Sequence, residues 1–287
     1  MKMPDNKIRS VCAYFHLKLD DLYSHNEVES FFWILLESEL NMRKMDFMMN
    51  PELRMKESDL LRFIGFVKRL MKFEPVQYIA GETQFMGRPF TVSPSVLIPR
   101  PETEELVTWI SQELKSVANP QIMDIGTGSG CIAISLKLEL PSAVVTGIDI
   151  QPKALEMARK NALLNNVEVT FNERDALQLH VETSLFDVIV SNPPYVLNSE
   201  KEQMRANVLE FEPHTALFVD DSDPLLFYRS IATWAFMALK PGGKLFFEIN
   251  ERYASETENM LLQQGFVELD VRNDFFDKPR MIKAVRK

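Results

Sequence analysis

The segment Asp124-Ile125-Gly126-Thr127-Gly128-Ser129-Gly130 decides the fold of this chain of 287 residues. It lies between an apolar segment, 121–125, that is typical of a buried strand and a segment, 131–139, that is typical of a helix. Its glycines permit a tight turn and a close approach of the backbone to a ligand. A glycine-rich turn between a strand and a helix is where an open α/β sheet binds a nucleotide-like molecule.

Strands and helices alternate on both sides of this turn. The patterns predict strands at 121–125, 144–149, 167–171, 186–191 and 244–249, and helices at 102–115, 131–139, 153–165, 224–239 and 253–264. Such alternation predicts an α/β fold with a mainly parallel, Rossmann-like sheet covered on both faces. The Lys-Pro-Gly-Gly segment at 240–243 predicts a stop before the strand at 244–249. Two consecutive strands, 266–271 and 281–285, predict an antiparallel hairpin at one edge.

The first part of the chain has a different pattern. Residues 1–74 contain long apolar helical segments, and we interpret their many methionines as core residues. Prolines and glycines then separate short strand-like segments at 77–79, 84–86 and 90–92. We therefore expect three parts, namely an N-terminal helical bundle (1–74) that docks a partner, a β-hairpin linker (75–100) and a catalytic domain (101–287).

The charge distribution argues against a nucleic-acid substrate. Residues 1–75 carry 12 basic and 12 acidic residues, so the whole formal net charge of −9 lies in residues 76–287. Binding to nucleic acid depends on Lys and Arg against phosphate. The prediction is that the chain has no direct nucleic-acid substrate, although a local basic patch stays possible.

The rare residues predict a cytoplasmic protein without a structural metal. Cys12 and Cys131 lie far apart, which implies no disulfide framework and fits a reducing compartment. The amino terminus lacks the apolar core of a signal peptide, and no segment approaches the roughly 18 apolar residues of a membrane helix. We expect no membrane association and a monomer. The histidines show no metal-ligand spacing; they are His16, His25, His180 and His214.

The glycine-rich segment favours S-adenosylmethionine over a dinucleotide or ATP. The dinucleotide motif requires a glycine where Cys131 stands, and the lysine of a Walker loop is absent. Asp149 ends the next strand, where a carboxylate can accept both ribose hydroxyls. Asp175 follows the strand after that and could accept from an adenine amino group. An acidic site without a phosphate-binding group suits this cofactor, although both carboxylates could also be plain solvated strand ends.

A second polar motif, Asn192-Pro193-Pro194-Tyr195, follows the predicted strand at 186–191. Proline has no N–H group and fixes φ, so the two prolines cannot continue a central strand. Asn192 adds a side-chain carbonyl and an amide, and Tyr195 adds a flat face. Together they form a site for a planar group that bears an NH2.

Four motifs in this order resemble the PrmC/HemK family of protein-(glutamine-N5) methyltransferases. They are Leu97–Glu104 (LIPRPETE), Asp124–Gly130 (DIGTGSG), Asn192–Tyr195 (NPPY) and Phe211–Pro213 (FEP). The resemblance covers nearly the whole chain and implies a class I methyltransferase sheet behind a small helical domain. It implies methyl transfer from S-adenosylmethionine, with S-adenosylhomocysteine as product, to the glutamine of the Gly-Gly-Gln motif of class I peptide chain release factors.

The resemblance also implies roles for individual residues. Cofactor binding falls to Gly126, Thr127, Gly128, Ser129, Gly130, Asp149, Asp175, Ala176 and Asn192. Catalysis falls to Asn192, Pro193 and Tyr195, and substrate binding to these three together with Pro194, Phe85 and Arg100. Arg100 stands between two prolines, and from chemistry alone it is either a linker residue paired with an acid or a charge at the rim of the site.

Two other functions compete with this one. A methyltransferase of a ribosomal-protein glutamine would use the same chemistry. A nucleic-acid base methyltransferase would place an exocyclic NH2 of a flipped base at the same motif. A scaffold that binds the cofactor without catalysis would not need both motifs intact.

Overall fold

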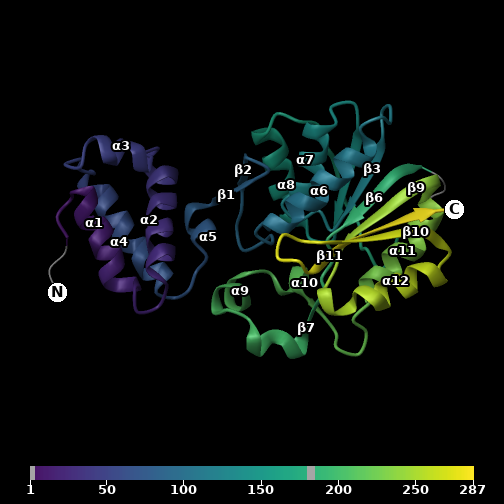
Figure 1. Cartoon of the computed structure of the whole chain (residues 1–287). Coiled ribbons are helices and arrows are strands. Elements are labelled where there is room, and N and C mark those ends of the chain that lie inside the picture. Colours follow the sequence, from purple (N-terminus) through teal and green to yellow (C-terminus); the bar gives the residue numbers. More distant parts are fainter. Residues whose placement is uncertain (1–3, 180–184) are drawn as a thin grey trace. The chain divides into compact units, whose positions relative to one another are not determined.

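The computed structural model describes residues 4–179 and 185–287 (Figure 1), so that His180 lies outside the described residues. The chain divides into two compact units. The first contains the chain up to Glu82 together with Arg205–Phe211, and the second contains Thr83–Met204 together with Glu212–Lys287. None of the helices in the described ranges has the length and apolar character that a membrane span requires.

The first unit is helical. Its elements are α1 (Ile8–Leu19), α2 (His25–Leu40), α3 (Lys44–Met49), α4 (Glu57–Leu70), α5 (Val76–Ala80) and α9 (Ala206–Phe211). Aromatic contacts among Phe15, Phe32 and Phe63, of which the two made by Phe32 are edge-on, join α1, α2 and α4 in its core. The methionines of α3 contradict our interpretation, because Met45 and Met49 are 67% and 82% exposed. That short helix places its apolar side chains at the surface of the unit.

The prediction of a strand at 77–79 is also wrong, since these residues belong to α5. Pro75 precedes the helix and its carbonyl accepts from the backbone of Tyr78 and Ile79. Gly81 ends it in the left-handed conformation, at φ 75°. A proline before and a left-handed glycine after are helix-boundary signals. Val76 and Ile79 pack into the helical core, which therefore extends beyond residue 74.

The second unit is built on a seven-stranded sheet with the order β10-β11-β9-β6-β3-β4-β5. The strands are β3 (Gln121–Ile125), β4 (Val144–Asp149), β5 (Thr170–Glu173), β6 (Phe186–Ser191), β9 (Leu239–Glu248), β10 (Phe266–Asn273) and β11 (Pro279–Arg286). Only β11 runs antiparallel to its neighbours, β9 and β10. The predicted parallel α/β sheet with an antiparallel hairpin at one edge is confirmed.

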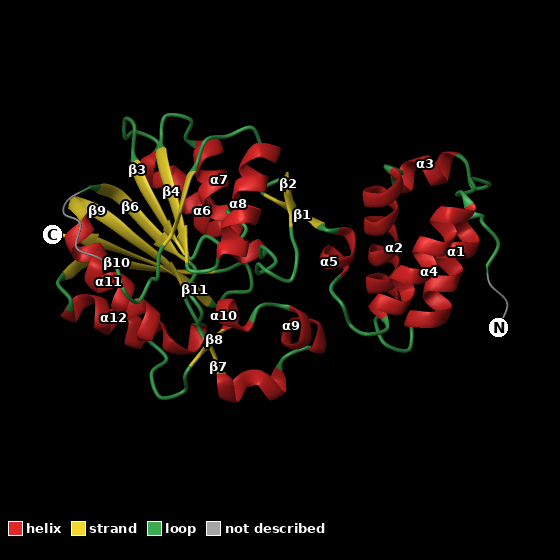
Figure 2. Ribbon diagram, turned by 180° about the vertical axis from the view of Figure 1, so that it is seen from behind, coloured by secondary structure: helices red, strands yellow, loops and turns green. Residues whose placement is uncertain are grey.

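Helices cover both faces of this sheet (Figure 2). The helices α6 (Pro101–Leu114), α7 (Cys131–Glu139) and α8 (Pro152–Leu164) pack on one face, and α11 (Leu226–Ala238) and α12 (Ala254–Gln263) on the other. The remaining elements are the hairpin β1 (Glu82–Phe85) and β2 (Arg88–Thr91), the pair β7 (Val196–Leu197) and β8 (Phe218–Val219), the short helix α10 (His214–Leu217), and the turns η1 (Asn198–Gln203) and η2 (Glu251–Tyr253).

Two strand boundaries differ from the prediction. Strand β9 begins at Leu239, so the Lys-Pro-Gly-Gly segment is part of the strand and not a stop before it. The register against β6 shifts there, with Leu239 opposite Phe186 and Lys244 opposite Val188. The extra residues form a bulge, which proline and glycine tolerate. Strand β5 begins at Thr170 and not at Val167, whose N–H is bonded to the end of α8.

Candidate active site

The site lies where the order of the sheet changes direction. The chain runs from β3 outward to β4 and β5, and then returns to β6 on the other side of β3. Ile125 and Ser191, the last residues of β3 and β6, are direct partners, and Ser191 Oγ donates to the Ile125 carbonyl at 2.7 Å. Ligands bind at such a point in open α/β sheets. The two motifs that follow these residues therefore begin side by side.

Both motifs line one cavity of about 420 Å³. The glycine-rich turn contributes four residues, Gly126 to Ser129, and the strand ends β4 and β5 contribute Asp149, Asp175 and Ala176. Asn192, Pro193 and Pro194 line the other part, together with Arg100. The structure thus brings together most of the predicted site residues. Gly130, Tyr195 and Phe85 are the predicted residues that do not line this cavity.

Buried Asp124 holds the glycine-rich turn in place. Its Oδ2 accepts from Thr127 Oγ1 at 2.7 Å and from the Ala133 N–H at 3.2 Å, so that one carboxyl joins the strand end, the turn and helix α7. Its Oδ1 is buried and has no hydrogen-bond partner. Burial raises the pKa of Asp124 to about 7, against the hydrogen bonds from Thr127 and Ala133 that lower it. The neighbouring charge of Asp149 raises it further.

Gly130 has a packing function and does not contact the cavity. It precedes α7 at φ 82°, and a Cβ there would lie 2.9 Å from Ile134 Cδ1 and 3.2 Å from Ala158 Cβ. A side chain at this position would separate α7 from α8. The close approach of two helices requires this glycine, and its role in cofactor binding stays a prediction.

Asp149 lies at the end of β4, opposite the turn. Its Oδ2 accepts from the Gly128 N–H and its Oδ1 from the Gln151 N–H, both at 2.9 Å. Burial raises the pKa of Asp149, and the two backbone hydrogen bonds oppose this increase. Asp175 accepts from the Leu177 N–H at 2.8 Å. Both carboxylates are therefore oriented by backbone groups.

Tyr195 lies behind the Asn-Pro-Pro segment and not beside the cavity. Its hydroxyl donates to Glu248 Oε1 at 3.1 Å, and its carbonyl accepts from Asn250 Nδ2 at 3.1 Å. Burial and the charge of Glu248 raise the pKa of Tyr195 far above its usual value. Its ring packs on the core between the sheet and helices α11 and α12. Tyr195 therefore anchors the loop to the end of β9, and its contact with the substrate stays a prediction.

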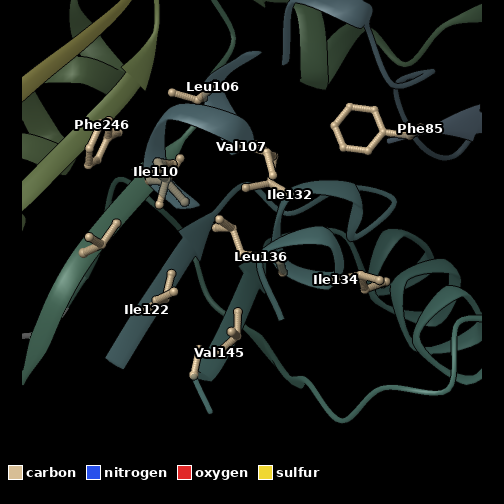
Figure 3. Packing of buried hydrophobic residues seen from close by; sticks show 14 of the residues in the cluster. Phe85, Leu106, Val107, Ile110, Ile122, Ile132, Ile134, Leu136, Val145 and Phe246 are labelled. Atoms are coloured by element: carbon tan, nitrogen blue, oxygen red, sulfur yellow. The ribbon is translucent and has the colours of Figure 1, made fainter. Parts of the chain in front are cut away.

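Phe85 is a core residue (Figure 3). Its ring is 1% exposed and makes an edge-on contact with Phe90 at 5.9 Å between centroids. It belongs to the same apolar cluster as Val107 and Ile132, which join α6 and α7. Packing of the β1–β2 hairpin on the catalytic unit accounts for this side chain, and its contact with the substrate stays a prediction.

Arg100 fits both of its alternatives. It lines the cavity, and its Nη2 lies 2.6 Å from Glu212 Oε1. Glu212 is 3% exposed, and its other oxygen accepts from the Ile98 N–H at 3.4 Å. The ion pair therefore joins the segment before α6 to the chain after α9. This arrangement holds a positive charge at the cavity with little freedom to move.

Sequence reasoning missed several residues of the cavity. They are apolar or small side chains from α6 and the loop before it, from the loops after β4 and β5, from α10 and β8, and from α11: Leu97, Thr103, Ile150, Leu177, Thr215, Phe218, Phe227 and Ile231. Leu97 and Thr103 belong to the Leu97–Glu104 motif, which gave neither of them a site role, and no local motif marks the other six. Only the fold brings them to the cavity.

Two histidines of the helical unit meet at a carboxylate. Asp20 lies 2.8 Å from His16 Nδ1 and 3.2 Å from His25 Nδ1, and the two imidazole rings stack at 4.0 Å. Their spacing in the sequence did not predict this group. The histidine hydrogen bonds, with that from His16 the largest contribution, lower the pKa of Asp20.

The fold is shared with a solved methyltransferase. The crystal structure of a methyltransferase from Pyrococcus furiosus matches with a TM-score of 0.51 at 18% identity, and covers 80% of this chain and 99% of that chain. Two family models match as well, the methyltransferase small domain over residues 103–212 and the PrmC N-terminal domain over residues 13–81. Fold and site together define a Rossmann-like methyltransferase.

Two relatives narrow this class. The release factor glutamine methyltransferase of Flavobacterium psychrophilum is 47% identical over 280 residues, which covers 96% of this chain and 98% of the relative. The release factor glutamine methyltransferase of Bacteroides thetaiotaomicron is 42% identical, with 96% and 99% covered. The chain belongs to the family of release factor glutamine methyltransferases, which confirms the resemblance seen in its motifs.

Proposed function

We propose that this chain transfers a methyl group from S-adenosylmethionine to the side-chain amide nitrogen of the glutamine in the Gly-Gly-Gln motif of class I peptide chain release factors. One observation carries the chemistry, namely that the acidic glycine-rich turn and the Asn-Pro-Pro segment line the same cavity. Family membership supports the choice of a release factor as the substrate.

The residues of the cavity fit the cofactor. Among its lining residues in the described part of the chain, the bases are Arg100 and Arg174 and the acids are Asp149 and Asp175. Arg100 is paired with Glu212, so the charge of this base is already balanced by a carboxylate. S-adenosylmethionine has a ribose diol but no phosphate. Asp149 would hold the diol, Asp175 and Ala176 the adenine, and the turn from Gly126 to Ser129 the amino-acid tail.

Asn192 and Pro193 would hold and activate the amide of the substrate. An amide nitrogen is a poor nucleophile because its lone pair is delocalised into the carbonyl. Asn192 Oδ1 and the Pro193 carbonyl would accept the two N–H groups, which orients the nitrogen and stabilises the positive charge that develops on it. When bound, the cofactor supplies an electrophilic methyl group. No strong base is needed before transfer, since the nitrogen becomes acidic as it gains the methyl.

The direct test is mass spectrometry of a release factor after incubation with this protein and S-adenosylmethionine. We expect one added methyl group, located by fragmentation on the glutamine of the Gly-Gly-Gln motif. A release factor with that glutamine changed to alanine is the matched control and should gain none. Parallel reactions with ribosomal proteins, DNA and RNA address the competing functions. Transfer to one of these and not to the release factor would overturn the proposal.

We also propose that the helical part of the chain, residues 1–74, docks the release factor, while the catalytic part, 101–287, follows the hairpin linker 75–100. The separate apolar core of the helical unit supports this division, as does the match to the PrmC N-terminal domain. Deletion of residues 1–74 should raise KM for a whole release factor much more than KM for a short peptide with the same glutamine. An equal effect on both would contradict docking by this part.

The physiological setting that fits this function is a monomer in the cytoplasm. Cys12 and Cys131 are unpaired, as a reducing compartment would leave them. Light scattering of the purified chain tests the oligomeric state, and a mass of twice the monomer would contradict it.

A further inference from the structure

The Asn-Pro-Pro segment is backed by a buried acid that the mechanism above does not use. Glu248 ends β9 and is 1% exposed. Its Oε2 accepts from Thr103 Oγ1 at 2.6 Å, and its Oε1 accepts from the Tyr195 hydroxyl at 3.1 Å. Thr103 lies in the first turn of α6, is 3% exposed and lines the cavity. One carboxylate therefore accepts from two hydroxyl groups, of which that of Thr103 belongs to a residue lining the cavity.

Thr103 connects this acid to the residue that would hold the substrate. Asn192 Nδ2 lies 3.5 Å from Thr103 Oγ1. A hydroxyl has one proton to donate. Thr103 donates that proton to Glu248, so toward Asn192 it can only accept. The end of the Asn192 amide that faces Thr103 must therefore be the NH2, which leaves Oδ1 directed away from Thr103.

The direction of the Asn192 amide matters for the reaction. The substrate amide offers two N–H donors, so it needs acceptors in the cavity. When Asn192 presents its Oδ1 to the substrate, it accepts one of these N–H groups. When it presents its NH2, an N–H donor of Asn192 would face an N–H donor of the substrate. A carboxylate can impose this order because it only accepts, whereas an amide in its place could also donate.

We propose that Glu248 and Thr103 are positioning residues. Through a relay of hydrogen bonds, they determine which end of the Asn192 side-chain amide faces the substrate. This inference rests on the proposed methyl transfer to an amide. The relay is held at the end of β9 by two more contacts, since the Tyr228 hydroxyl donates to the Glu248 carbonyl at 3.2 Å and Asn250 Nδ2 to the Tyr195 carbonyl at 3.1 Å.

The test compares Thr103→Val, which removes the hydroxyl at nearly constant volume, with Thr103→Ser, which keeps it. Thr103→Val should lower kcat on the order of 10- to 100-fold, with little change in the affinity for S-adenosylmethionine. Thr103→Ser should recover most of the turnover. Thr257→Val is the matched control, since Thr257 is equally buried in α12 and bonds only to the Tyr253 carbonyl among the described residues. Its turnover should equal that of the parent chain.

A double-mutant cycle separates positioning from a general loss of structure. In an Asn192→Ala background, Thr103→Val should have no further effect on kcat, because there is no amide left to orient. Glu248→Gln should lower kcat as well, since a glutamine can accept from only one of the two hydroxyls. Additive losses in the cycle would overturn the relay, as would full turnover of Thr103→Val.

A spectroscopic measurement keeps the inference independent of the substrate. The side-chain 15N resonance of Asn192, assigned by its absence in Asn192→Ala, should shift in Thr103→Val and return in Thr103→Ser. An unchanged resonance in Thr103→Val contradicts the relay whatever the methyl acceptor is. Absence of transfer to a release factor by the parent chain would instead contradict the proposed function alone.

Discussion

The two loops that line the cavity are built by different means. The glycine-rich turn is held mainly through its backbone N–H groups: those of Gly126 and Thr127 donate to the Ile148 carbonyl of β4 and that of Gly128 to Asp149, all at 2.9 Å. Asp124 adds one side-chain contact, to the Thr127 hydroxyl. The Asn192–Tyr195 segment is held by side chains from other elements, namely Thr103, Glu248 and Asn250. The conformation of the first loop requires residues in the loop itself that permit its backbone angles. The conformation of the second loop requires particular side chains from the elements around it.

This difference fits the task that each loop would have. A cofactor that is similar in every reaction cycle can be held by a backbone of constant shape. A substrate amide must be oriented within a narrow geometry, and side chains with a defined donor and acceptor order can do this. Damage to the second loop should therefore reduce turnover, while damage to the first should reduce stability or cofactor affinity.

Removal of the Asn192 side chain should have the largest effect. Asn192→Ala deletes one of two acceptors for the substrate amide, so kcat should decrease by about 10²–10³-fold, as for the loss of one such group. Titration calorimetry should show cofactor affinity largely unchanged. Retention of the parent's turnover in a methyl-transfer assay would refute the role of this segment.

The second effect concerns the stability of the glycine-rich turn. Gly130→Ala introduces a Cβ near Ile134 and Ala158 in a left-handed conformation, and should lower the free energy of unfolding by about 1–3 kcal/mol. Gly126→Ala is the matched control, because Gly126 shares the left-handed conformation at φ 75° but has no atom within 4 Å of such a Cβ. Urea denaturation should find Gly130→Ala the less stable of the two. An equal decrease in the free energy of unfolding of both variants would mean that the packing of α7 against α8 does not require a glycine at position 130.

The sequence predicts the first loop better than the second, for a physical reason. A backbone-built turn is encoded by adjacent residues, so Gly126 to Ser129 could be identified from their glycines, and Asp149 from its distance to them. Asn192 to Pro194 were identifiable because two prolines cannot continue a strand. The relay behind them was not, since Thr103 and Glu248 are 145 residues apart and neither belongs to a motif with the other.

The same reason limits what the sequence predicts for single side chains. Phe85 and Tyr195 are aromatic residues near predicted loops, and no local pattern distinguishes a ring that contacts a ligand from one that packs in the core. The segment Arg205–Phe211 groups with the helical unit although more than a hundred residues separate it from that unit in the sequence. Strands and helices followed from periodicity, whereas the partners of a single side chain depend on the topology.

The third effect tests the acidic end of β4. Asp149→Asn keeps the shape of the side chain but replaces one accepting oxygen with an NH2 donor. That donor would face the Gly128 N–H, the Gln151 N–H or the ribose diol. We expect the affinity for S-adenosylmethionine to decrease by about tenfold, or about 1.4 kcal/mol. The kcat at saturating cofactor should change little. A decrease in kcat with unchanged affinity would place Asp149 in the substrate loop's function.

The last effect concerns the pH dependence of stability. The pKa of Asp124 is raised to about 7 in the folded chain from an ordinary value of 3.8, so the folded state binds a proton that the unfolded state releases between these values. Its contribution to stability is present below pH 3.8 and decreases as the pH rises toward 7, by up to about 1.4 kcal/mol per pH unit.

Asp124→Asn removes this titration while keeping an acceptor for Thr127 and Ala133. The free energy of unfolding of the parent, measured against Asp124→Asn by urea denaturation from pH 4 to 8, should fall with rising pH and then level off. Parallel pH profiles would show that the turn is held by an ionised Asp124, in which case a charge, and not only the backbone, supports the first loop.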